Sequence, residues 1–432
     1  EKGITIWQND FSNAAQWTTS NDPQGTPAHT AGDWTITTNV AGIPVAALAP
    51  AGHTTAANGF AFINSDAAGG NAFQNASIVF NQNIDLSAEA NVLLKFEQSH
   101  RRYAETTYVL WSTDGGATWS ALSTVIDYNN LQAGNPAPVV DLTDPRYPAG
   151  RIFLFYNTGN NDEYSMRMGK GIREVWYVTS IDEGATWSTP VNITAQVHRP
   201  NQPGINKAYS CKEDWRSYAN TPGHATQFLT GMYKGRIYVA ANHSSGPPQK
   251  NFEDYNAHAF YTDNHGESFS LANSIILPGS NEATAAPLTN GKLILNARNQ
   301  AGTVRYRYVA YSNDGGASWQ ENYFDTSLVD PVCEGSILDV GQKKGKTILA
   351  FCNAADAKKR DNLTLRISYD EGKTWTNNTT KNKAIVIAKA PENYKGDYAA
   401  YSDLVALDAK RIGVLYEKEN YSKIVFTVCN WK

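Results

Sequence analysis

The side chains that most often bind metals or carry out redox chemistry are sparse in this chain of 432 residues. It has four cysteines, Cys211, Cys333, Cys352 and Cys429. None belongs to a Cys-x-x-Cys pair, so the sequence predicts neither a metal site nor a cofactor held by these residues. Four cysteines are also too few for a disulfide scaffold. We expect either buried free thiols or one bridge between Cys333 and Cys352 across neighbouring strands.

The balance of charges argues against a nucleic-acid partner and allows a small anionic ligand. Lys and Arg number 37, Asp and Glu number 41, and the formal net charge is −4. A protein that binds nucleic acid needs a basic face that replaces the counterions of the phosphates. The sequence therefore predicts no nucleic-acid binding. Its arginines remain available to grip a carboxylate or a similar group.

The elements that must position such side chains are β-strands. The chain has 11 Trp, 23 Tyr and 33 Gly, and only 18% of its residues are charged. Aromatic strands separated by Gly, Asn and Asp turns give this profile. No apolar stretch reaches the roughly 18 residues that a membrane span needs. The chain opens at Glu1 without a leader pattern, so we expect a secreted, periplasmic or cell-surface protein whose signal peptide has been removed.

An eight-residue pattern, Ser-x-Asp-x-Gly-x-Thr-Trp and its variants, recurs along the chain. Its copies occupy residues 112–119, 180–187, 262–269, 312–319 and 368–375. In each copy the acidic residue or Asn caps a hairpin turn through backbone amides, and Gly takes the positive-φ position. A β-rich apolar run precedes each turn, and spacings of roughly 50 to 80 residues suit four-stranded blades. This is the Asp-box repeat, and it predicts an all-β fold, a six-bladed β-propeller.

The N-terminal part of the chain has no Asp box. Short apolar strands between Gly-, Asn- and Ala-rich loops indicate a β-sandwich-like, jelly-roll-like segment over residues 1–78. We place the propeller at residues 79–432. In a second interpretation the N-terminal module extends to about residue 120, and the first blade is atypical.

From about residue 91 onward the chain resembles bacterial and animal exo-α-sialidases, block by block and in the same order. The matching blocks lie at residues 134–141, 151–157, 221–227, 241–243, 279–282, 295–298, 331–336, 360–364, 401–404 and 415–417. The resemblance implies hydrolysis of terminal sialic acid on glycans or glycoproteins, with net retention at the anomeric carbon. It implies no cofactor and no metal for this chemistry.

The resemblance also implies which residues act. Sialic acid carries a carboxylate on its anomeric carbon, which would repel a carboxylate nucleophile. A neutral phenol avoids the repulsion if a base takes its proton. The family motifs match Tyr401 as this nucleophile and Glu282 as its base. Two carboxylate-binding arginines correspond to Arg298 and Arg360, and Arg366 competes for the second of these roles.

Two further family positions are not filled as expected. The first carboxylate-binding arginine aligns with Asn81, a neutral side chain, unless Arg101 or Arg102 replaces it. The usual acid/base Asp has no counterpart in residues 99–107, where Glu105 is the better substitute and His100 the other. If the N-terminal module extends further, neither alignment holds.

Three functions therefore compete. The first is a retaining exo-α-sialidase, and intramolecular or intermolecular sialyl transfer would use the same residues. The second is a catalytically impaired, lectin-like propeller that only binds sialic acid. The third is a protein-interaction propeller in which the Asp boxes are the one true signal, because a fold does not by itself imply a function.

Overall fold

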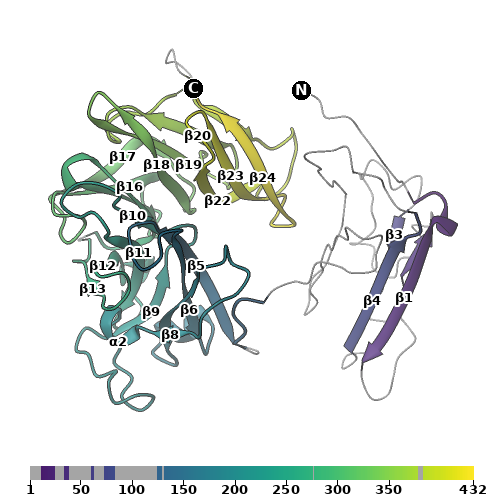
Figure 1. Ribbon diagram of the computed structural model, residues 1–432, viewed down its shortest axis with the longest axis horizontal. Helices are drawn as coiled ribbons and strands as arrows, with labels where there is room; N and C mark the ends of the chain where they lie inside the picture. The colour runs from purple at the N-terminus through teal and green to yellow at the C-terminus, as the bar shows by residue number, and fades with distance from the viewer. Residues whose placement is uncertain are drawn as a thin grey trace. The chain divides into compact units, whose positions relative to one another are not determined.

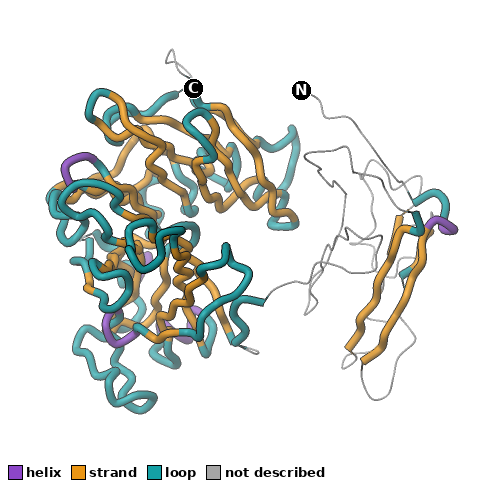
Figure 2. Tube along the Cα trace, in the orientation of Figure 1, coloured by secondary structure: helices purple, strands orange, loops and turns teal. Residues whose placement is uncertain are grey.

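The computed structural model describes residues 11–24, 34–37, 60–62, 73–82, 124–128, 131–275, 277–377 and 383–432. The chain divides into two compact units, Glu1–Leu122 and Ser123–Lys432. The described part is built of strands with few short helices (Figures 1 and 2). Among these residues no helix has the length and apolar character needed to cross a membrane.

The described part of the first unit consists of two small antiparallel pairs. Strand β1 (Trp17–Gln24) pairs with β4 (Phe73–Phe80), and β2 (Thr35–Thr37) pairs with β3 (Phe60–Phe62). A short 3-10 turn, η1 (Ala14–Gln16), precedes β1. The rings of Trp17 and Phe80 lie 5.1 Å apart and close one end of the larger pair. A jelly-roll-like module stays a prediction for this unit.

The second unit is a β-propeller in which five antiparallel sheets are described (Figure 1). The first sheet is β5 (Gln132–Asp141), β6 (Arg151–Gly159), β7 (Arg173–Ser180) and β8 (Val191–Asn192). The second is β9 (Trp215–Asn220), β10 (Thr226–Gln227), β11 (Ile237–Ser245), β12 (Tyr255–Thr262) and β13 (Ser270–Leu271). The third is β14 (Ser280–Pro287), β15 (Leu293–Asn299), β16 (Tyr306–Ser312) and β17 (Glu321–Val329).

The remaining sheets complete the described ring. The fourth is β18 (Gly335–Lys343), β19 (Lys346–Ala354), β20 (Leu363–Ser368) and β21 (Ile385–Ala388). The fifth is β22 (Ala399–Ala406), β23 (Arg411–Lys418) and β24 (Lys423–Asn430). The short helices are α1 (Glu163–Arg167), α2 (Thr194–Val197), η5 (Lys250–Phe252) and η6 (Thr289–Gly291). Strand β14 lies beside β11 and β18, and β18 lies beside β22, so successive sheets pack side by side.

The all-β propeller predicted from the repeats is confirmed, with five blades described where the sequence predicts six. The first Asp box, at residues 112–119, lies outside the described residues. Four Asp boxes are described, and each connects the last two strands of its blade. All four cysteines are free thiols, so the bridge between Cys333 and Cys352 is not formed.

Each described Asp box closes its turn as its residue types predict. Asp182 accepts hydrogen bonds from the backbone N–H and the hydroxyl of Thr186, at 2.9 and 2.5 Å. The hydroxyl of Ser180 accepts from the N–H of Gly184, whose φ is +89°. The copies at residues 312–319 and 368–375 repeat these contacts, and in the degenerate copy at 262–269 Asn264 replaces Asp. The turns are therefore structural elements of the blades.

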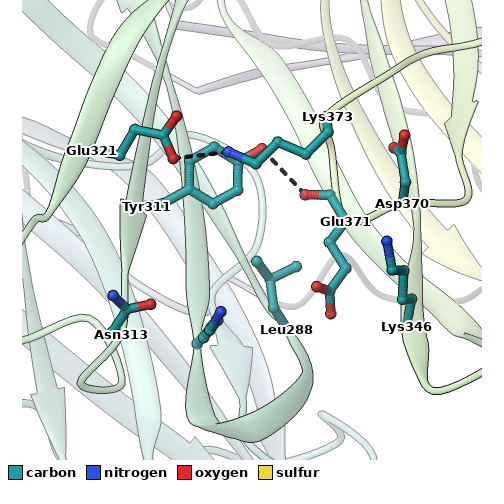
Figure 3. Close-up of a pocket in the computed structure, with 9 residues that line it drawn as sticks. Leu288, Tyr311, Asn313, Glu321, Lys346, Asp370, Glu371 and Lys373 are labelled. Carbon is teal, nitrogen blue, oxygen red and sulfur yellow. Dashed lines mark hydrogen bonds and ion pairs between the residues drawn. The ribbon is translucent and has the colours of Figure 1, made fainter.

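The Asp boxes also join neighbouring blades. The phenol of Tyr238 donates to the carbonyl of Gly316 in the next blade, and Tyr311 donates to the carbonyl of Glu371. A Cβ at Gly316 would lie 2.2 Å from the Tyr238 ring, so only glycine allows this approach. Beside the second contact lies a cavity of about 230 Å³ (Figure 3). There the Glu371 carboxylate accepts hydrogen bonds from the backbone N–H and the hydroxyl of Thr289, which belongs to the preceding blade. The cavity therefore lies at a junction between two blades.

Three buried histidines form a cluster beside strands β11 and β12 of the second described sheet. His198, His243 and His258 are at most 2% exposed. His243 and His258 share one hydrogen bond between their Nδ1 atoms at 3.0 Å, and Trp215 stacks on His243. Burial lowers the pKa of all three histidines, that of His258 to about 3. The cluster is therefore uncharged in the folded protein.

We expect the propeller to lose stability below about pH 6.5. The unfolded histidines bind protons there that the folded ones do not, so the free energy of unfolding falls with pH by up to about 1.4 kcal/mol per unit for each histidine. His224 acts in the opposite sense: burial lowers its pKa, but the charge of Asp403 and its hydrogen bond raise it overall. Denaturant unfolding of wild type and of His258→Gln at pH 7, 6 and 5 measures the slope. An unfolding free energy equal at pH 7 and 5 in the wild type contradicts this account.

Candidate active site

Tyr401, Glu282 and Arg298 meet in one hydrogen-bonded cluster, although they lie on two different blades. The Tyr401 hydroxyl donates to Glu282 Oε1 at 2.5 Å. Arg298 Nη1 donates to Glu282 Oε2 at 2.7 Å and to the Tyr401 oxygen at 2.8 Å. All three side chains are partly buried. The structure thus joins a phenol to a carboxylate that can take its proton and to a cation that can stabilise the resulting oxyanion.

β-Bulges position the phenol and the carboxylate. In β22 the three steps from Ala399 to Ser402 face only two steps in β23, and Tyr401 lies within this irregular stretch. In β14 the stretch from Ser280 to Ala283 shows the same mismatch against β15, and it contains Glu282. A bulge bends the strand and re-aims a side chain. Both side chains therefore leave the regular alternation of the ladder and turn toward each other.

Burial and charge set the protonation of the cluster. Burial raises the pKa of Tyr401 far above its ordinary value, and Glu282 raises it further while Arg298 opposes the shift. Burial lowers the pKa of Arg298, but the charges of Glu282 and Tyr401 raise it overall. The phenol is thus neutral and the guanidinium charged at rest. Tyr401 can become a nucleophile only when its proton moves to Glu282.

Arg360 approaches the same phenol from the loop between β19 and β20. Its guanidinium carbon lies 5.4 Å from the centre of the Tyr401 ring, a cation–π distance. Nη1 donates to the hydroxyl of Tyr421 at 2.9 Å, and Nη2 donates to the carbonyl of Val332 at 3.3 Å. Asp397 accepts from both the Arg360 N–H and the Tyr421 hydroxyl. Two guanidinium groups therefore lie beside Tyr401, and the second is held in place by a tyrosine and an aspartate.

A second polar group lies along β22, two residues beyond the phenol. Asp403 accepts from His224 Nδ1 at 2.6 Å and from the Ser336 hydroxyl at 3.0 Å. His224 belongs to the loop between β9 and β10, and Ser336 belongs to β18. The contacts therefore tie the strand that carries Tyr401 to two other blades. They restrain the position of the strand.

The structure places four of the five predicted site residues together and does not describe the fifth. Tyr401, Glu282 and Arg298 are in direct contact, and Arg360 lies over the Tyr401 ring. Glu105 and its competitor His100 lie outside the described residues, as do Arg101 and Arg102, the two candidates to replace the first arginine. Arg366, the competitor of Arg360, instead donates to Asn353 within its own sheet at 3.1 Å.

Asn81, the side chain aligned with the first family arginine, is used locally in the first unit. Its amide nitrogen donates to the Ala15 carbonyl at 3.2 Å, and its amide oxygen accepts from Thr18 at 2.5 Å. These bonds give Asn81 a structural role at the end of the β1–β4 pair.

Sequence reasoning missed the residues that hold the cluster in place. Tyr421 and Asp397 belong to no matching block, and Glu334, Glu417 and His224 were recognised only as parts of matching blocks. The runs that contain Glu334 and His224 did carry a signal, since both lie in blocks that follow the family order. What such polar residues do is decided by contacts across blades, which the sequence does not contain.

Among the described residues, one group has the composition of a metal site: Asp141, Asp144 and His265. Its carboxylates already have partners. Arg146 and Arg151 donate to Asp144 at 2.9 and 3.1 Å, and Asp141 accepts from His265 at 2.8 Å. The group is an ion-pair network at the turn that follows β5.

Comparisons with known proteins show the family to which the chain belongs. Residues 104–412 match the family model described as a BNR repeat-like domain. The chain is 30% identical to a sialidase of Micromonospora viridifaciens over 71% of its own length and 44% of the relative. It is 27% identical to a sialidase of Bacteroides fragilis, over 71% of this chain and 53% of the relative. The chain thus spans about half the length of these two curated relatives.

A solved structure shares the fold. The structure titled Hadza microbial sialidase Hz136 superposes with a TM-score of 0.55 and 24% identity. The match covers 74% of this chain and 58% of that one. Since the family model matches well over half of the residues, this chain belongs to the family of proteins with a BNR repeat-like domain.

Proposed function

We propose that the chain is a retaining exo-α-sialidase that releases terminal sialic acid from glycoconjugates. The observation that carries the proposal is the 2.5 Å hydrogen bond between Tyr401 and Glu282, with Arg298 bonded to both. A neutral phenol paired with a base suits a sugar whose anomeric carbon already bears a negative carboxylate. The curated sialidases among its relatives support the same chemistry.

The first step is attack of the Tyr401 oxygen on the anomeric carbon while Glu282 takes the phenol proton. Arg298 and Arg360 bind the substrate carboxylate, and their charges favour the anionic sugar in this position. The bond to the leaving oxygen breaks, and a general acid protonates that oxygen. From the sequence we assign this acid as Glu105, which lies outside the described residues.

The second step is hydrolysis of the tyrosyl–sugar bond. Water attacks the anomeric carbon with help from the residue that had acted as acid, and Glu282 returns the proton to the Tyr401 oxygen. Two displacements at one carbon give net retention of configuration. The substrates are terminal sialosides of glycans or glycoproteins.

Replacing Tyr401 by Phe tests the nucleophile. With a fluorogenic aryl sialoside we expect kcat to fall by about a thousandfold or more, because the covalent route is lost. Tyr323→Phe, on the outermost strand β17, removes the same atom far from the cluster and serves as the matched control. NMR of the first product should show the α-anomer. Saturable sialoside binding by wild type without turnover would instead indicate a lectin, and a β-anomeric first product would exclude the retaining route.

Replacing Tyr421 by Phe tests whether Arg360 is a substrate-binding group. The substitution removes the hydroxyl that accepts from Arg360 Nη1 and donates to Asp397, so the guanidinium is held less firmly. We expect KM for the sialoside to rise about three- to tenfold while kcat changes little, as for the loss of one hydrogen bond. Steady-state kinetics beside the Tyr323→Phe control measure both constants. A fall in kcat at constant KM would argue against this role.

A further inference from the structure

Two glutamate side chains hold the backbone of the bulge that carries Tyr401. The Tyr401 N–H donates to Glu417 Oε2 at 3.3 Å, and the Ser402 N–H donates to Glu334 Oε2 at 2.9 Å. A bulge breaks the regular hydrogen bonding of its ladder, and buried amides need other partners. The two carboxyl groups therefore help to fix the backbone direction from which the phenol leaves the strand.

Glu334 differs from other carboxyl groups of the site in its surroundings. It directly precedes β18 and is 1% exposed. Among the described residues, its only hydrogen-bond donor is the Ser402 amide, and its Oε1 atom is buried without a partner. A buried carboxylate normally has an ion-pair partner or several donors, because an isolated buried charge is very costly.

The cation whose charge acts on Glu334 does not fill this role. Arg307 is fully buried, but its Nε donates to Asn296 at 2.6 Å and its Nη1 donates to Asp330 at 3.0 Å and to the Cys333 carbonyl. Its field favours the charged form of Glu334 without a direct hydrogen bond.

The other ionisable groups that act on Glu334 oppose its ionisation. Asp403 on β22 and Glu282 on β14 carry negative charge, and the thiols of Cys333 and Cys352 add no cation. Burial raises the pKa of Glu334 well above its ordinary value, and Asp403 and Glu282 raise it further. The Ser402 amide and Arg307 act in the opposite direction without cancelling the shift.

We propose that Glu334 is a positioning residue, an uncharged carboxylic acid whose oxygen holds the Ser402 amide and so aims Tyr401 at Glu282. The proposal rests on the proposed sialidase function. Neutrality matters because an anion behind Tyr401 would resist the growth of negative charge on the phenol oxygen. It would also repel the carboxylate of the substrate.

Two substitutions of Glu334, with one control, distinguish a neutral Glu334 that accepts a hydrogen bond from an ionised Glu334. Glu334→Gln keeps the shape and the accepting oxygen, so we expect its kcat to stay within about threefold of wild type near pH 6. Glu334→Ala leaves the Ser402 amide without its partner, so we expect kcat to fall about 10- to 100-fold with KM nearly constant. Glu213→Gln, at an exposed loop position, is the matched control.

The pH profile is the readout that a merely structural residue would not change. Ionisation of Glu334 at alkaline pH should slow the wild type, so the alkaline limb of kcat/KM should move to higher pH in Glu334→Gln. The proposal is overturned if Glu334→Gln loses as much activity as Glu334→Ala, if Glu334→Ala matches wild type, or if the alkaline limb does not move.

A thermodynamic measurement tests the neutral state independently of turnover. A folded acid with a raised pKa holds its proton where the unfolded acid has lost it, so wild type should lose stability relative to Glu334→Gln as pH rises above about 4.5. The two denaturation midpoints, measured from pH 4.5 to 8, should diverge. If wild type shows no turnover, the sialidase proposal fails while this comparison still decides the state of Glu334. A constant difference between the midpoints shows that Glu334 is ionised and overturns the neutral assignment.

Discussion

The site depends on one shared hydrogen-bond system, in which the phenol of Tyr401 and the guanidinium of Arg298 both donate to the carboxylate of Glu282. Each polar group would be costly to bury alone. Together they satisfy one another, with the charge of Arg298 balancing that of Glu282. Because Arg298 also donates to the phenol oxygen, the charge that develops there on proton transfer meets an existing donor.

This system spans blades, so it can exist only if the blades are held in register. Tyr401 comes from β22 of the fifth described sheet, whereas Glu282 and Arg298 come from β14 and β15 of the third. The fourth sheet lies between them and contributes Ser336 and the neighbouring Glu334, which bind groups on β22. Asp-box turns lock the opposite ends of the blades through tyrosine hydroxyls. The repeated blades therefore form a rigid frame, and strands β14, β15 and β22 carry residues of the candidate site.

The charges around Tyr401 form an ordered pattern. Arg298 and Arg360 lie beside the phenol, where an anionic group of a ligand can meet them. Asp403 is paired with His224, and burial disfavours the charged form of Glu334. Cations thus lie beside the phenol, while the negative groups of the neighbouring strands are paired or suppressed. This is the polarity that a sugar with a carboxylate at its reacting carbon requires.

Sequence alone determined the blade architecture, because each Asp box encodes its own turn through local contacts of Ser, Asp, Gly and Thr. The order of matching blocks also predicted Tyr401, Glu282, Arg298 and Arg360 as candidate site residues, since their motifs carry their own signature. It could not show that Tyr401 and Glu282 sit at β-bulges, because a bulge is a mismatch between two strands. Nor could it reveal the roles of Tyr421, Glu334 and His224. Their partners lie tens to nearly two hundred residues away, and only the closed packing of blades brings them into contact.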